Sequence, residues 1–239
     1  MSISSPKRQA RLAGALYLVI ILAGMFAEVF IRPKILVAGD AAATARNLLT
    51  HASLYRVGLL TDLLTVVAAV AEGVIVYRLF KPLSSTLALT SLLIALVSNA
   101  GEMVSALIHL LPVLILHGGH AAQALPQGQW EELAQLAMRT HTGFLAITLG
   151  IFSFALCIDG YLVFVSTFVP RVIGVLLMVA SACYLLNSVA YLADLPLGPL
   201  DGLILVPAFL GELSFCLWLL VRGVDEGRWR AVDAASSAR

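Results

Sequence analysis

Apolar residues fill six long stretches of this 239-residue chain, and polar residues gather in the short segments between them. A helix needs about 20 predominantly apolar residues to cross the hydrocarbon core of a bilayer, and each stretch reaches that length. The pattern predicts one all-α domain over 11–223, a bundle of six transmembrane helices at about residues 11–31, 54–79, 87–115, 141–165, 171–192 and 202–221. A short segment, 1–10, precedes it.

Two connections between the predicted spans are longer than a turn. In the first, Asp40 precedes three alanines and is expected to cap a short helix on the membrane surface. In the second, Gly118-Gly119 breaks the chain before a helix that starts near Gln129 and continues into the fourth span. Residues 224–239 are small and polar, which predicts a disordered tail.

The amino-acid composition indicates that the protein is surrounded by lipid and not by water. Hydrophobic residues make up 60% of the chain and charged residues 12%, against roughly half and a quarter in soluble domains. The lipid bilayer is therefore the expected environment and partner. The net charge is +1 and the basic residues are dispersed between apolar runs, so the chain lacks the basic patch of a nucleic-acid-binding protein.

The distribution of basic residues predicts the topology. With six spans, ten of the 15 Lys and Arg residues fall on one side and five on the other. Cytoplasmic segments keep an excess of Lys and Arg, so both termini are expected in the cytoplasm and both long connections outside. Lys7, Arg8 and Arg11 precede the first span as they would a secretory signal. We interpret that span as uncleaved, because its apolar core is about 20 residues and no clear small-residue site follows.

Acidic residues inside the apolar stretches are the first candidates for chemistry. A central Asp or Glu costs up to about 3 kcal/mol on insertion scales, so such residues usually face the bundle interior and have a partner or a role. Glu102 and Glu212 lie closest to the centres of their spans, and each follows a glycine that lets helices approach. Glu28, Glu72 and Asp159 lie nearer the span ends and are interpreted as interfacial anchors.

Further polar residues extend this pattern. On the third span Ser98, Glu102, Ser105 and His109 are spaced four, three and four apart, which places them on one helix face. Asp62 lies about two turns into its span, where Arg56 and Arg139 are candidate partners. We predict an outward-opening polar cavity that binds a proton, a cation or a small polar ligand, built from Glu102, His109, Asp62, His141, Asn187 and Glu212. The alternative is interhelical hydrogen bonding alone, worth about 0.6 kcal/mol per contact.

Signals for other chemistry are weaker. The run His117-Gly118-Gly119-His120, with an acid nearby, has the spacing of a metal motif but sits in a glycine-rich loop. His109 and His141 are candidates for axial haem ligands only if their helices face each other. The sequence contains no Gly-x-Ser-x-Gly, no His-Glu-x-x-His and no phosphate-binding glycine loop. We therefore predict no metal and no cofactor, and we favour a non-enzymatic protein over an intramembrane enzyme.

Short motifs along the chain are similar to those of a known family. They are Arg11-Leu12-Ala13-Gly14-Ala15-Leu16-Tyr17, Tyr55-Arg56-Val57-Gly58, Pro170-Arg171-Val172-Ile173-Gly174 and Gly211-Glu212-Leu213-Ser214. Over about residues 8–223 the chain resembles the bacterial integral-membrane family catalogued as domain of unknown function 4386. The resemblance implies a single multi-span domain in the plasma membrane of a bacterial cell, and it implies no assigned activity.

The sequence favours a small transporter or permeation protein whose ligand or coupling proton engages Glu102 and Glu212. A non-catalytic membrane sensor or scaffold that acts through partner helices is the second hypothesis. An intramembrane enzyme or cofactor-binding protein is the third.

Overall fold

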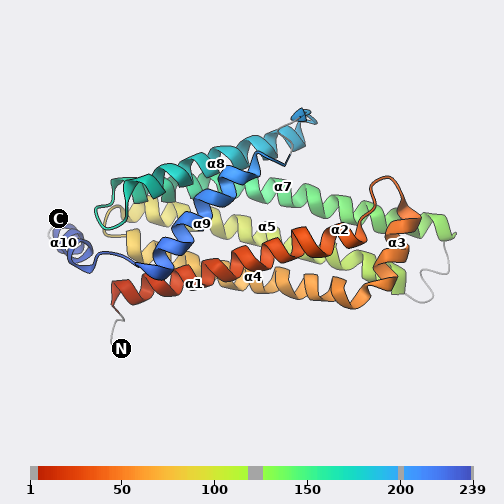
Figure 1. Cartoon of the computed structure of the whole chain (residues 1–239), viewed down its shortest axis with the longest axis horizontal. Coiled ribbons are helices and arrows are strands. Elements are labelled where there is room, and N and C mark those ends of the chain that lie inside the picture. Colours follow the sequence, from red (N-terminus) through yellow and green to blue (C-terminus); the bar gives the residue numbers. More distant parts are fainter. Residues whose placement is uncertain (1–4, 118–125, 199–201, 238–239) are drawn as a thin grey trace. The chain divides into compact units, whose positions relative to one another are not determined.

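Long helices make up most of the structure, a computed structural model that describes residues 5–117, 126–198 and 202–237 (Figure 1). Within these ranges five helices are long and apolar enough to cross a membrane, or six if a bent pair counts as one span. The predicted all-α polytopic architecture is confirmed. The elements in chain order are α1 (Pro6–Met25), the π-helical turn η1 (Phe26–Ile31), α2 (Arg32–Ile35), α3 (Ala41–Thr50), α4 (Ala52–Phe80), α5 (Ser85–His117), α7 (Gln127–Val165), α8 (Arg171–Leu192), α9 (Leu205–Val221) and α10 (Glu226–Ser237).

The bent pair consists of α9 and α10. Helix α9 has 17 residues and coincides with most of the sixth predicted span. It meets α10 at 98°, so α10 does not continue the direction of α9. The described residues therefore contain five spans by length and composition, and a sixth only if the bent pair is counted as one span.

The predicted helix of the first long connection is present as α3. Asp40 precedes it in an extended conformation, and the Asp40 Oδ1 atom accepts a hydrogen bond of 2.7 Å from the amide of Ala43. This satisfies one of the amides that a helix start leaves without an intrahelical partner. The helix expected near Gln129 is the start of α7, which begins at Gln127 and runs without a break through the fourth predicted span. Residues 118–125 of that connection lie outside the described part of the chain.

The first span extends beyond its predicted end at residue 31. The amide of Arg32 donates to the carbonyl of Ala27, five residues back, which is the spacing of a π-helix. Pro33 follows, and a proline cannot donate to the helix ladder and crowds the carbonyl four residues before it. The wide turn of η1 therefore precedes the proline, and it keeps Arg32 in the same helical run as Glu28.

The C-terminal segment differs from its predicted disorder, since residues 226–237 form α10. Asp225 caps this helix by accepting from the amide of Arg228 at 3.0 Å. The indole of Trp229 donates to the carbonyl of Leu79 at 2.8 Å, and the Asp225 amide donates to the carbonyl of Phe168 at 3.2 Å. The small, polar composition of this segment suggested disorder, because it does not show that one residue, Trp229, holds the helix through its bond to Leu79.

The chain divides into two compact units. Unit 1 comprises Met1–Val19, Ala68–Asn99 and Ala146–Arg239, and unit 2 comprises Ile20–Val67 and Ala100–Leu145. Helices α1, α4, α5 and α7 contribute residues to both.

Close helix contacts without intervening side chains organise unit 1, where α8 and α9 lie side by side (Figure 1). A Cβ atom on Gly211 of α9 would lie 2.6 Å from the carbonyl oxygen of Leu176 on α8. A Cβ atom on Gly174 would lie 2.5 Å from the carbonyl oxygen of Gly160 on α7. Glycine at these positions lets the helix backbones touch, as in other membrane proteins.

Unit 2 has its own apolar core, and Tyr55 is part of it. Tyr55 at the start of α4 is buried among side chains of α2, α3, α5 and α7. The residues packed around it are Ile31, Ile35, Leu48, Val113 and Met138.

The glycine contact between α7 and α8 predicts that Gly174→Ala destabilises the protein by about 1–3 kcal/mol, because the added methyl group meets backbone that cannot rotate away. Gly24→Ala is the matched control, since a Cβ there would meet nothing within 4 Å. Thermal unfolding of both variants in detergent measures the difference. Equal midpoints for the two variants would contradict the assigned contact.

Candidate functional site

Three of the predicted site residues lie together in unit 2. The Nδ1 atom of His109 on α5 is 2.7 Å from the Oδ2 atom of Asp62 on α4. The His109 ring stacks on that of His141 from α7, with centroids 4.4 Å apart and planes at 22°. Both histidines are buried. The structure thus joins three membrane-crossing helices through one acid and two imidazoles.

The hydrogen bonds of His141 assign its tautomer. A guanidinium nitrogen of Arg32 lies 2.6 Å from His141 Nε2, and arginine can only donate, so Nε2 carries no proton. The Nδ1 atom lies 2.7 Å from the Ser105 hydroxyl oxygen and 3.1 Å from the Ser105 carbonyl oxygen. His141 is therefore held neutral, with its proton on Nδ1 facing Ser105.

Tyr55 fixes the orientation of His109 from the other side. Its hydroxyl donates to the backbone carbonyl of His109 at 2.6 Å. Its ring meets the His109 ring edge-on, with centroids 4.5 Å apart and planes at 81°. His109 is therefore enclosed between Tyr55 and His141 while its Nδ1 atom is directed at Asp62.

An ion pair extends this group to the first span. Arg32 lies 2.7 Å from a carboxylate oxygen of Glu28, four residues earlier. The polar network of unit 2 thus runs from Glu28 through Arg32, His141 and His109 to Asp62. When both imidazoles are neutral and both acids ionised, two carboxylates and one guanidinium leave one negative charge. In that state, binding one proton would bring the net charge of the network to zero.

Sequence reasoning missed two members of this network. Arg32 lies just outside the first predicted span, which ends at residue 31, because hydropathy does not show that η1 continues the helix. Glu28 was interpreted as an interfacial anchor, and its side chain is indeed 43% exposed. The four-residue spacing of Glu28 and Arg32 is the signal that indicates a pair on one helix face. Asp62 bonds to His109, a partner that was not considered beside Arg56 and Arg139.

Glu212 occupies a different polar cluster, in unit 1. The Tyr17 hydroxyl on α1 donates to Glu212 Oε1 at 2.9 Å, and the Tyr184 hydroxyl on α8 donates to Oε2 at 2.7 Å. Each carboxylate oxygen thus has its own phenol donor. Also in unit 1, the Ser91 hydroxyl donates to Asp159 at 2.7 Å, so Asp159 bonds across helices instead of serving only as an anchor.

The remaining predicted residues divide between the units. Glu102 lies half-buried on α5 in unit 2, three residues before Ser105. Asn187 lies half-buried on α8 in unit 1, the unit that also contains Glu212. The structure brings together Asp62, His109 and His141, and one cavity shared by all six residues stays a prediction.

The chain matches the sequence model of one protein family, Domain of unknown function (DUF4386), over residues 12–223. It belongs to that family. The matched region contains all six predicted site residues and every membrane-crossing helix of the DUF4386 protein except the first residues of α1. No curated protein and no solved structure matches the chain.

The positions of the described side chains of this DUF4386 protein can be compared with the requirements of a metal site, a haem site and a Ser-His-Asp triad. Among the residues that the structure describes, no three His, Cys, Asp or Glu side chains are placed to hold a metal ion together. The stacked rings of His109 and His141 leave no space for a porphyrin between them. The described residues of this site do not form a Ser-His-Asp arrangement, because Ser105 bonds to His141 whereas Asp62 bonds to His109.

The Asp62–His109 bond predicts measurable coupling in a double-mutant cycle with Asp62→Leu and His109→Phe. Hydrogen bonds in membrane proteins average about 0.6 kcal/mol in such cycles. We expect about 1–2 kcal/mol here, because both partners of this bond are ionisable, whereas a serine hydroxyl is a neutral donor, and charge strengthens a hydrogen bond. Unfolding measurements on the four proteins give the value. A cycle on Ser91→Ala and Asp159→Leu is the comparison, and a coupling for Asp62 and His109 that does not exceed it contradicts the assignment.

Proposed function

We propose that this protein is a small membrane transporter that moves protons, alone or together with a small solute, and that the Asp62–His109 pair is its proton-binding site. The observation that carries this proposal is the contact between the buried imidazole of His109 and the half-buried carboxylate of Asp62, which lie on two apolar helices. Chains of Asp, Glu and His within membrane spans are typical of proton relays in pumps and transporters. Histidine is also the side chain whose charge ordinarily changes near neutral pH.

The hydrogen bonds suggest where the proton binds. In neutral His109 the Nδ1 hydrogen is donated to Asp62, so the lone pair is on Nε2. A proton that adds to Nε2 makes an imidazolium, which the Asp62 carboxylate stabilises at 2.7 Å. This step neutralises the single negative charge of the unit 2 network.

The neighbouring ring limits uptake to one proton. Two imidazolium rings with centroids 4.4 Å apart would repel each other strongly in a medium of low dielectric constant. Arg32 already places a positive charge beside His141. His141 therefore stays neutral while His109 changes charge, and the pair carries at most one proton at a time.

A flux assay tests the function. Full-length protein is reconstituted into liposomes that contain a pH-sensitive dye, and a membrane potential is imposed. We expect wild type to acidify or alkalinise the lumen, and Asp62→Asn and His109→Gln to reduce the flux to that of empty liposomes. Asp159→Asn is the matched control, because it makes the same change in an intramembrane aspartate bonded to a serine.

Two outcomes would overturn the proposal. Wild-type flux equal to that of empty liposomes across the pH range, with and without sodium or potassium gradients, removes the transport function. Flux that Asp159→Asn abolishes as completely as Asp62→Asn removes the assignment to the Asp62–His109 pair.

We also propose the plasma membrane as the location, with both termini in the cytoplasm. The excess of Lys and Arg on the side of the termini supports this orientation. A reporter that matures only in the cytoplasm is expected to be active when fused after Arg239 and inactive when inserted after Gly39. The reverse pattern would show that the first loop, not the termini, faces the cytoplasm.

A further inference from the structure

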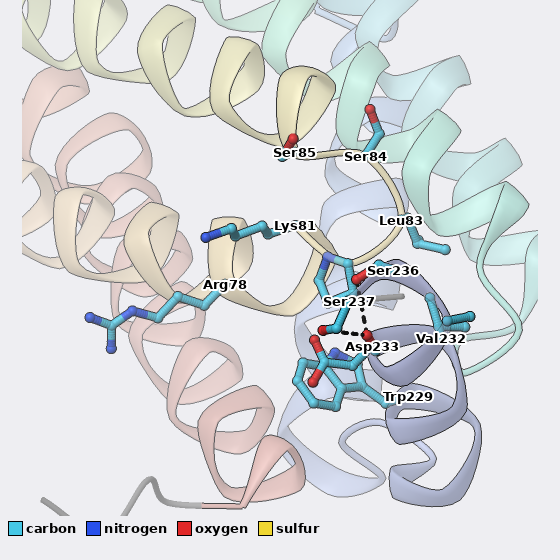
Figure 2. A pocket seen from close by; sticks show the side chains of 12 residues that line it. Arg78, Lys81, Leu83, Ser84, Ser85, Trp229, Val232, Asp233, Ser236 and Ser237 are labelled. Carbon is cyan, nitrogen blue, oxygen red and sulfur yellow. Dashed lines mark hydrogen bonds between the residues drawn. The ribbon is translucent and has the colours of Figure 1, made fainter. Parts of the chain in front are cut away.

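A cavity of about 780 Å³ in unit 1 lies between the turn that joins α4 to α5 and the C-terminal helix α10 (Figure 2). Its volume falls within the roughly 300–1,000 Å³ typical of small-molecule sites. Trp229 forms part of the wall and holds α10 against the turn through its bond to the Leu79 carbonyl. This cavity has no part in the unit 2 network.

The lining of the cavity is basic. Arg78 and Lys81 extend from the end of α4 to the same side, and both are exposed (Figure 2). Asp233 is the one acid among the lining residues, so one positive charge is in excess. The amino end of α5 also opens here, where the Ser84 hydroxyl accepts from the Leu87 amide at 3.3 Å, and a helix start adds partial positive charge.

The lining is also amphipathic. Leu83 and Val232 lie on the opposite side of the cavity from the charged ends of Arg78 and Lys81 (Figure 2). Trp229 adds a large ring whose polar atom is already bonded to Leu79. A ligand that fits this lining carries a negative charge at one end and apolar carbon at the other.

The position of the cavity indicates which class of amphipathic molecule can reach it. Helices α4 and α5 are both membrane-span candidates, and the cavity lies where the first ends and the second begins. Span ends lie at the depth of lipid phosphates, and basic pockets between transmembrane helices bind anionic headgroups. The basic-residue distribution predicts that this end faces the cytoplasm, where anionic lipids are enriched.

We propose that this cavity binds the phosphate headgroup of an anionic phospholipid. Arg78 and Lys81 contact the phosphate, while Trp229, Leu83 and Val232 contact the glycerol and the first acyl carbons. The apolar side favours a lipid over free phosphate, which would use only the basic side. The bound lipid would join α10 to the α4–α5 turn.

Lipid-dependent thermal stability of the purified full-length chain tests this site. The unfolding midpoint is followed during titration with phosphatidylglycerol, with phosphatidylcholine and with inorganic phosphate. We expect phosphatidylglycerol alone to raise the midpoint of wild type. Arg78→Gln with Lys81→Gln is expected to weaken the apparent affinity about 30-fold, which corresponds to about 1 kcal/mol for each basic side chain removed.

Two further variants test whether the effect is specific to the cavity. Ser85→Asp places a carboxylate in the cavity at a helix start, where it favours folding but opposes a phosphate, and it is expected to weaken lipid binding as well. Lys34→Gln with Arg46→Gln removes two exposed basic residues elsewhere and is expected to leave the titration unchanged. Equal titrations for all variants, or an equal response to phosphatidylcholine, overturn the proposal. An equal response to inorganic phosphate overturns the lipid as the ligand.

Discussion

The bilayer offers no water to the side chains inside the spans, so each polar group there must find its partner within the protein. Three of the described acids meet this constraint through bonds to other helices. Asp62 bonds to an imidazole, Glu212 to two phenols and Asp159 to a serine hydroxyl. Each of these bonds crosses between helices, so the groups that are most expensive to bury also decide which helix faces meet.

Packing makes these bonds possible. Gly211 lets α9 approach the backbone of α8, next to the carboxylate that Tyr184 of α8 reaches. In unit 2 the apolar core around Tyr55 places its ring against His109. In unit 1 a small residue brings polar side chains within hydrogen-bonding distance. In unit 2 a buried aromatic residue has the same effect.

Hydropathy and capping chemistry were sufficient to predict the spans and α3, since both depend on local sequence. The grouping of Asp62, His109 and His141 followed from the rule that polar residues face inward. Arg32 and α10 could not be predicted in the same way. Arg32 enters the network through a π-helical turn before Pro33, and α10 depends on one bond from Trp229 to a distant carbonyl. Tyr184 was overlooked because a phenol in an apolar helix resembles ordinary core.

The partners explain why the proposed proton site is Asp62–His109, although Glu102 and Glu212 lie closer to the centres of their spans. A phenol releases its proton only in strongly alkaline solution, so Tyr17 and Tyr184 act on Glu212 as fixed donors. An imidazole both gives and takes a proton near neutral pH. Arg32 fixes the tautomer of His141, whereas the ring of His109 faces the Asp62 carboxylate. Depth in the membrane therefore identifies residues that need a partner, whereas the chemistry of the partner decides which of them can exchange a proton.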